Sequence, residues 1–306
     1  MRVTNSLMSK SYLRNLNRQT TKLQKYQDQL SSLKEVSRPS DDPLTVSKIL
    51  DLNNSITLNE KYQDTIDDAI DWTNVQDAAL GQASNSLARI RTLIQSAANG
   101  TMSSDDRKAV KNDIEGEIGS LMDALNTNFG GRYVFSGQNT TTKPFTYSID
   151  ESGIVIQYHD PENKNEENLP REVSPGVTVD LLTNGNKLVN IDGEELDQFF
   201  NDVFDALDKG DQESLDALGG SLLEKADKAF ENVVNFRTEV GATFNRLESA
   251  KERNETENLS LQNMRSNKQD VDLAEKYMEY TMEMVAYQST LQMGTKILQT
   301  NILNYL

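Results

Sequence analysis

The 306-residue sequence contains no cysteine and only one histidine, His159. Without cysteine the chain cannot form a disulfide scaffold, a thiolate zinc site or a thiol nucleophile, and one histidine cannot build a multi-histidine metal site. No apolar run approaches the roughly 18–20 residues of a membrane-spanning helix, and the first residues lack the continuous apolar stretch of a cleavable signal peptide. We therefore predict no membrane insertion, no bound metal and no cofactor.

Apolar residues are scarce and the charge is strongly acidic. Hydrophobic residues make up 36% of the chain, and 48 acidic against 31 basic residues give a net charge of −17. An acidic chain repels phosphate, so a nucleic-acid partner is excluded. The low apolar content is insufficient for a thick core and favours long helices with narrow apolar faces.

Patterns typical of catalysis are missing. The sequence has no Walker loop, no Gly-x-Gly-x-x-Gly and no nucleophile elbow. His159 follows a predicted strand and is interpreted as a polar strand-end residue, and the acidic loop around Glu162 lacks calcium-loop spacing. We predict that the protein is not an enzyme.

The first helix is predicted over residues 1–34. Its apolar positions alternate four and three apart, which keeps one stripe facing a partner helix. We call this stripe the amino-terminal seam: Tyr12, Leu16, Gln19, Leu23, Tyr26, Leu30 and Leu33. Seven basic residues against Asp28 alone make this segment a basic arm in an acidic chain.

Two further helices are predicted before residue 129. Asp41 or Asp42 can cap a helix that begins near Pro43 and continues to about residue 98, a length of about 80 Å. Its stripe alternates four and three residues apart and is predicted to be Tyr62, Ile66, Ala69, Thr73, Gln76, Leu80, Ala83, Leu87, Ile90, Ile94 and Ala97. Asn99-Gly100 ends it. A third helix opens at Ser103 or Ser104, and the short loop predicts an antiparallel pair. Its buried stripe is predicted to be Val110, Ile114, Ile118, Leu121 and Leu125.

The pattern becomes β-like between residues 129 and 190. Strands are predicted at 133–135, 145–149 and 154–158, the last two forming a hairpin around a glycine-containing turn. Residues 160–170 are predicted to form a surface loop. Strands at 177–179 and 187–189 are predicted to complete a small sheet.

Helical periodicity returns after Gly193. A short helix is predicted over 196–207, followed by a long one with a four-three stripe from Leu222 to Ala250 and a bend or phase shift within 251–272. The last helix carries the carboxy-terminal seam: Leu273, Tyr277, Tyr280, Met284, Tyr287, Leu291, Gly294, Leu298, Asn301 and Tyr305.

The predicted fold class is mainly α with a β insertion: a long helical rod with coiled-coil termini and a small β-rich outer domain. Terminal coiled-coil segments are assigned to 1–40 and 268–306, a helical rod to 41–135 and 195–267, and the inserted β domain to 136–194.

The two seams suggest a function in assembly. Each is narrow and interrupted by polar or minimal residues, so an isolated segment gains little from burial and orders when a partner covers it. The amino-terminal segment is basic and the carboxy-terminal one acidic, so we expect the ends to pair with each other or with other copies. The candidate assembly residues are Tyr12, Leu16, Leu23, Tyr26, Leu30, Leu33, Tyr277, Tyr280, Met284, Tyr287, Leu291, Leu298 and Tyr305.

Four segments resemble one protein family. They are MRVTNSLMSKSYLRNLNRQ at the start, SRPSDDPLTVSKIL (37–50), FGGRYVFSGQNTTTKPF (129–145) and the final EKYMEYTMEMVAYQSTLQMGTKILQTNILNYL. The third is the most specific. The chain resembles the hook–filament junction family (hook-associated protein 3) of the flagellin-like superfamily.

The resemblance implies a structural protein of the bacterial flagellum that is exported without a cleaved signal through the flagellar type III apparatus. It implies an extracellular location at the hook–filament junction. The implied partners are hook-associated protein 1, flagellin, an export chaperone and other copies of the chain in a ring. Two alternatives stay open: a short filament flagellin, and a secreted coiled-coil effector or adhesin.

The sparse seams predict that the ends of a free subunit are mobile. Brief proteolysis of purified monomer is expected to trim both termini and to leave a core of roughly residues 40–270. Mass spectrometry of the fragments measures this, and equal resistance along the whole chain would contradict it.

Overall fold

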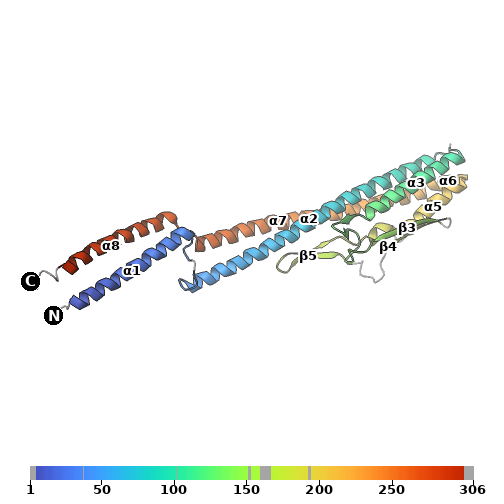
Figure 1. Ribbon diagram of the computed structural model, residues 1–306. Coiled ribbons are helices and arrows are strands. Elements are labelled where there is room, and N and C mark those ends of the chain that lie inside the picture. The colour runs from blue at the N-terminus through green and yellow to red at the C-terminus, as the bar shows by residue number, and fades with distance from the viewer. Residues whose placement is uncertain are drawn as a thin grey trace, which may run out of the picture. The chain divides into compact units, whose positions relative to one another are not determined.

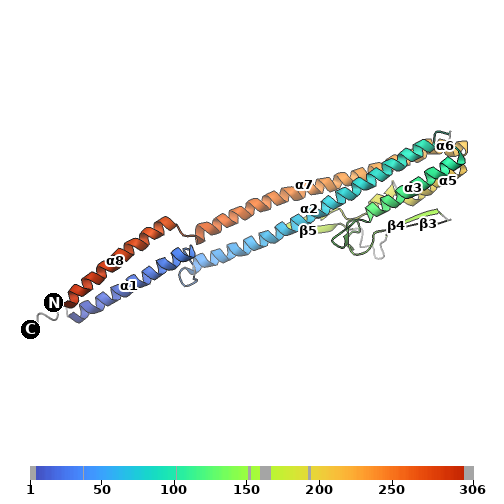
Figure 2. The same ribbon diagram turned by 45° about the horizontal axis from the view of Figure 1, so that its top comes forward.

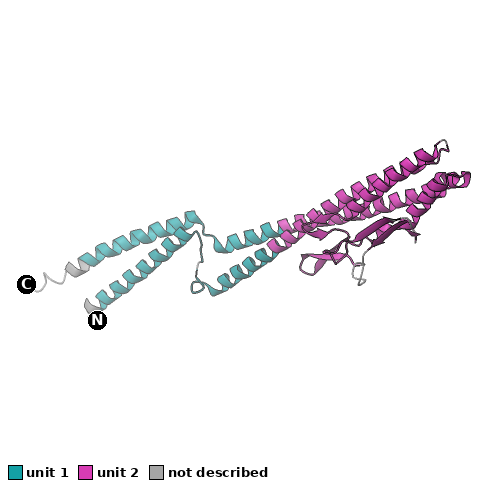
Figure 3. Ribbon diagram, turned by 45° about the vertical axis from the view of Figure 1, so that its right-hand side comes forward, with its two compact units in different colours: residues 1–59, 256–306 teal, residues 60–255 magenta. Residues whose placement is uncertain are grey.

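A computed structural model describes residues 5–36, 38–100, 102–150, 153–158, 167–191 and 194–299. The chain divides into two compact units, shown in teal and magenta in Figure 3. Unit 1 contains residues 1–59 and 256–306, and unit 2 contains residues 60–255. His159 and Glu162 lie outside the described residues. The three-domain division drawn from the sequence stays a prediction.

Four helical segments make up the described part of unit 1. They are α1 (Asn5–Ser32), the beginning of α2 (Pro43–Ala97), the end of α7 (Ser221–Gln269) and α8 (Leu273–Gln299). Figures 1 and 2 both show α1 and α8 side by side, and the two helices contact each other along their lengths. Within the described residues, no helix combines the length and apolarity needed to span a membrane.

The start of α2 is set by the predicted cap. Asp42 Oδ1 accepts hydrogen bonds from the backbone amides of Leu44 and Thr45, each at 3.1 Å, and Pro43 is the first helical residue. These bonds satisfy amides that have no partner within the helix. The hydroxyl of Thr45 also donates to Asp42 Oδ2, and this bond, followed by the Thr45 amide, lowers the pKa of Asp42.

Within unit 2, α2 and α7 are antiparallel and their predicted stripes form the centre of the core. Ion pairs join Asp67 to Lys251 and Asp77 to Arg237, so later residues of α2 meet earlier residues of α7. The stripe of α7 is buried as predicted, and so is that of α2 from Ile66 onward. The helices therefore bury narrow faces, as the composition predicted.

Further helices pack around this pair. α3 (Ser104–Leu125) opens with a capping box between Ser103 and Asp106 and buries the whole predicted stripe. α5 (Leu196–Lys209) ends at Gly210, whose φ of 58° gives the left-handed cap. α6 (Gln212–Gly219) was not predicted, although Asp211 caps it by accepting the Ser214 amide at 2.9 Å.

The β region consists of separate antiparallel pairs, so the expectation of a small sheet is wrong. In the described residues β1 (Asn128–Phe129) pairs with β2 (Arg132–Tyr133), and β3 (Phe145–Asp150) with β4 (Gly153–Tyr158). β5 (Leu169–Ser174) pairs with β6 (Val177–Leu181), and β7 (Asn190–Ile191) with β8 (Glu194–Glu195). The predicted hairpin is β3–β4, in which Ile149 lies opposite Ile154.

Three local predictions in this region are wrong. The strand predicted at 133–135 ends at Tyr133, and Val134 and Phe135 lie in a turn. Residues 187–189 form a helical turn, α4 (Asn186–Val189), rather than a strand, because the turn buries Leu188 while Asn232 donates to the carbonyl of Lys187. The predicted loop at 160–170 is wrong at its end, because β5 begins at Leu169. Pro170 and two charged residues obscure the alternation of apolar and polar residues in this strand. An edge strand tolerates such a proline.

Two asparagine side chains anchor the β3–β4 hairpin to the helices. The Phe145 amide donates to Asn126 Oδ1, and Asn126 Nδ2 donates to the Phe145 carbonyl, both at 3.0 Å. Asn201 of α5 binds Ile154 of β4 in the same two-sided way, each bond measuring 2.7 Å. Each amide thus replaces a neighbouring strand at one edge of the hairpin.

The predicted phase shift in α7 occurs without a break in the helix. Up to Ala250 the buried positions of α7 alternate four and three residues apart. From Ala250 the buried and half-buried positions follow two successive steps of four residues, to Asn254 and Asn258. Such a step locally changes the winding of a helix pair. The helix itself continues to Gln269.

We expect Asn201→Ala to destabilise unit 2 by about 2 kcal/mol, because two backbone groups of Ile154 lose their partner. Urea unfolding followed by circular dichroism measures the free energy, and hydrogen exchange reports the Ile154 amide. Asn74→Ala, at an exposed position of α2, is the matched control. Equal effects of the two variants would contradict the anchoring role.

Candidate assembly interface

The helix pair α1–α8 is held by a mixed polar and apolar seam. Of the amino-terminal seam, the six positions from Tyr12 to Leu30 are half-buried against α8. Leu33 is 53% exposed and has a φ of 59°, because α1 ends at Ser32. Gln29, which the sequence pattern did not single out, is 5% exposed and donates to the Glu35 carbonyl at 2.7 Å.

Gly294 of α8 packs directly against Tyr12 of α1. A Cβ atom built on Gly294 would overlap the phenol ring of Tyr12. Gly294 is buried and helical, so the absence of a side chain is what lets α1 and α8 approach here.

The other end of the pair is fixed by a charged cluster. Lys276 Nζ lies 3.2 Å from Glu35 and 2.9 Å from Glu279, and 5.6 Å from the centre of the Tyr26 ring. The Lys276 side chain is only 12% exposed. Burial opposes the charged form of Lys276, but its bonds to Glu279 and Glu35 outweigh that effect and raise its pKa. The cluster is therefore a charged contact inside unit 1.

Backbone hydrogen bonds support this cluster. The Glu35 amide donates to the Gln269 carbonyl at 2.7 Å, and the Val271 amide donates to the Leu33 carbonyl at 3.2 Å. The segments that follow α1 and α7 are thus paired with each other. They fix where α8 begins relative to the end of α1.

The predicted carboxy-terminal seam divides into two sets. Tyr280 and Tyr287 are half-buried and, with Gly294, lie on the side of α8 that also carries Lys276. The other four described positions are exposed, and we call them the flanking strip: Leu273, Tyr277, Met284 and Leu291. The side chain of Leu298 lies outside the described residues, as do Asn301 and Tyr305.

A second exposed apolar set lies elsewhere around α8. We call it the far strip: Met278, Met282, Val285 and Met293. Met282 and Met293 are each 66% exposed. A helix that is apolar on most sides is normally buried on most sides, yet α1 covers one side of α8. Within the described residues, the helix therefore has more apolar surface than the chain covers.

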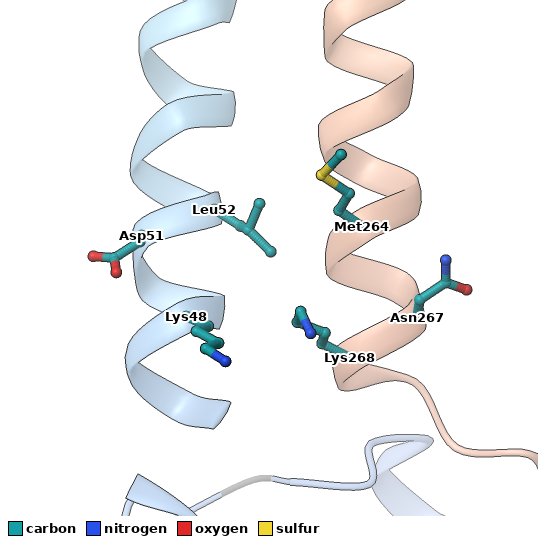
Figure 4. A pocket seen from close by; sticks show the side chains of 6 residues that line it. All are labelled: Lys48, Asp51, Leu52, Met264, Asn267 and Lys268. Carbon is teal, nitrogen blue, oxygen red and sulfur yellow. The ribbon is translucent and has the colours of Figure 1, made fainter. Parts of the chain in front are cut away.

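Unit 1 also contains an open slot between α2 and α7, with a volume of about 450 Å³. Figure 4 shows Leu52 and Met264 directed toward one another across it, with Lys48 and Lys268 below them. The slot has an apolar centre with two lysines at its edge, and the carboxylate of Asp51, which also lines it, points away from Met264. In the part of the chain that the structure describes, no group of three or more His, Cys, Asp or Glu side chains could hold a metal ion.

Family models match both ends of the chain. The bacterial flagellin N-terminal helical region matches residues 3–140, and the bacterial flagellin C-terminal helical region matches residues 223–306. The chain belongs to the bacterial flagellin family. It is a structural protein of the flagellum, and the prediction of a non-enzymatic protein is confirmed by this membership.

Relatives of this flagellin-family chain match it over nearly its whole length. It is 27% identical to flagellar hook-associated protein 3 of Escherichia coli K12, over 95% of each chain. It is 23% identical to a flagellin of Bacillus subtilis, over 95% of this chain and 94% of that one. Hook-associated protein 3 of Legionella pneumophila shares the fold: its crystal structure gives a TM-score of 0.61 at 16% identity, covering 70% of this chain and 96% of that chain.

We expect Gly294→Ala to weaken the α1–α8 pair, because the new methyl group displaces Tyr12 at a cost of about 1–3 kcal/mol, more than the roughly 1 kcal/mol that alanine contributes to a helix. Hydrogen exchange of α1 amides measures the loss. Gly241→Ala in α7, where a Cβ meets no atom within 4 Å, should be neutral or stabilising. Adding Tyr12→Ala should restore protection in part, and no change in α1 exchange would refute the contact.

Proposed function

We propose that this protein is the adaptor that joins hook-associated protein 1 to the flagellin filament at the hook–filament junction. The observation that carries the proposal is the apolar surface of α8 beyond the side that faces α1. The flanking strip and the far strip are too apolar for a helix that functions in water alone, which supports burial by neighbouring subunits.

The proposed assembly is a ring of copies in which each subunit contributes its α1–α8 pair. Affinity then comes from many narrow strips buried together. The candidate residues keep their role in two groups: Tyr12, Leu16, Leu23, Tyr26, Leu30, Tyr280 and Tyr287 hold the pair, while Leu33, Tyr277, Met284 and Leu291 meet neighbours. Leu298 and Tyr305 remain predicted assembly residues on the sequence alone.

The proposed location is outside the cell, reached through the flagellar type III apparatus. Exposed methionines on α8 would bind other apolar surfaces before assembly. An export chaperone that covers α8 in the cell fits this surface. Methionine side chains adapt to more than one partner, which suits a helix covered first by a chaperone and then by neighbouring copies.

A second candidate function is a short filament flagellin. The identity to Bacillus subtilis flagellin over nearly the full length of both chains favours it. The two functions differ in amount and in phenotype. A junction protein is a minor component of purified flagella whose deletion leaves hooks and sheds flagellin, whereas a filament protein is the major component. Absence from purified flagella would instead favour a secreted effector or adhesin.

We expect Met282→Glu to abolish filament formation while hooks still form and flagellin accumulates in the medium. The charge would lie in the far strip, where burial of a carboxylate is unfavourable, and leaves the α1-facing side unchanged. Electron microscopy of cells and immunoblotting of the medium measure the outcome.

The matched control is Asn112→Glu, which adds the same charge at an exposed position of α3, outside both apolar strips of α8. It should leave filaments normal. Circular dichroism of both purified variants checks that the helices persist. Normal filaments with Met282→Glu would remove the far strip from the mechanism.

A further inference from the structure

The outward side of α1 carries a row of cations without partners. We call it the basic stripe: Lys10, Arg14, Arg18 and Lys25. Steps of four, four and seven place these residues on one side of the helix, and each is exposed. Among the described residues none of them lies within ion-pair distance of a carboxylate, whereas Lys22 beside them reaches Glu283 at 3.7 Å.

The basic stripe is not neutralised by its own helix either. Asp28 is the one acidic residue of α1, and it lies 3.7 Å from Arg38. In a chain with a net charge of −17, this is a rare positive surface. Exposed cations at regular spacing point to an anionic partner of similar spacing.

Helix α2 carries a surface of that kind in unit 2. We call it the acidic stripe: Glu60, Asp64, Asp68 and Asp71. Steps of four, four and three place them on one side of the helix, and all four are exposed. Asp67 lies among them and is paired with Lys251 at 2.7 Å, while Lys61 is the single cation of the stretch.

We infer that the basic stripe of one subunit docks on the acidic stripe of a second copy of this chain. This inference rests on the proposed function, because it names the partner surface that orients copies in the assembly. The two stripes have opposite sign, and each contains two successive steps of four residues. The net charge of −17 makes two copies repel on average, and this pairing brings surfaces of opposite charge together.

The basic and acidic stripes can fix the register between copies, which the apolar strips of α8 cannot do. Apolar burial is non-directional, so the flanking and far strips give affinity without fixing the register between copies. Exposed ion pairs are individually weak and screened by salt. Because each row is short, the largest number of ion pairs forms in one register, which makes the contact specific and salt-sensitive.

The first test reverses charges in the full-length chain expressed in a deletion strain. Arg14→Glu/Arg18→Glu is expected to lower the amount of the protein in purified flagella roughly tenfold, since lost pairs become repulsive contacts. Asp64→Lys/Asp68→Lys should have the same effect. The chain that carries both reversals should recover, because the pairs re-form with opposite polarity.

Controls with equal charge change separate pairing from net charge. Lys108→Glu/Lys143→Glu matches the first reversal, and Asp113→Lys/Asp123→Lys matches the second, all at exposed positions. Both control variants should assemble normally. Failure of the doubly reversed chain to recover, or equal loss in the controls, would overturn the inference.

The second test uses the absence of cysteine from the native sequence. Thr21→Cys is exposed between Arg18 and Lys25 on the basic stripe, and Asp64→Cys lies in the acidic stripe. Differently tagged full-length chains carrying one change each, mixed and treated with a short bismaleimide, should give a heterodimer. Its yield should fall severalfold at high salt. Thr21→Cys mixed with Asp113→Cys is the control pair.

The two tests separate this inference from the proposed function. Protein present in flagella without the cross-link or the charge rescue would overturn the inference alone. Protein absent from flagella but cross-linked in solution would overturn the proposed function and retain the copy-to-copy contact. Binding of the wild-type chain to vesicles of phosphatidylglycerol, lost with Arg14→Glu/Arg18→Glu and without any cross-link, would assign the stripe to lipid and overturn the inference.

Discussion

The shortage of apolar side chains is the constraint on which the rest of this structure depends. Hydrophobic residues make up 36% of the chain, so each helix buries a stripe and the core is drawn out along α2 and α7. Several stripe positions are polar, among them Thr73 and Gln76, which are fully buried. A buried polar side chain needs a hydrogen-bond partner. These hydrogen bonds determine which other segments of the chain the helices bind.

The buried amides are what hold the β region in place. Gln76 Nε2 donates to the carbonyls of Val134 and Leu182 at 2.9 and 2.8 Å, and Asn126 and Asn201 bind the edges of the β3–β4 hairpin. An isolated pair of β-strands is only marginally stable in water. Asn126 and Asn201 supply the contacts of a missing strand to the β3–β4 hairpin, and Gln76 binds the residues that directly follow β2 and β6. The strand pairs are thus attached to a helical scaffold without a common sheet.

Burial could be predicted from the sequence in helices whose apolar residues follow a single periodic pattern. The stripes of α2, α3 and α7 combine one apolar side with polar remaining sides, so their spacing identified the buried residues. The seam of α8 was resolved only in part because this helix is apolar almost all round, and Met278 or Val285 fits a four-three pattern as well as Tyr280 does. Gln29 could not be found from periodicity, because its burial depends on the Glu35 carbonyl beyond the end of α1.

The contrast between α1 and α8 explains why their attachment to the rest of unit 1 is polar. In the proposed assembly, neighbouring copies bury the apolar surface of α8, and the outward side of α1 carries the basic stripe. Neither helix then has spare apolar area for its connection to the rest of unit 1. Lys276, Glu35 and the backbone bonds between residues 33–35 and 269–271 make that connection instead. Hydrogen bonds depend on direction as well as distance, whereas apolar contacts tolerate sliding. The polar connection therefore holds the helix pair at one register, and in the proposed assembly it leaves the apolar strips of α8 available to other copies.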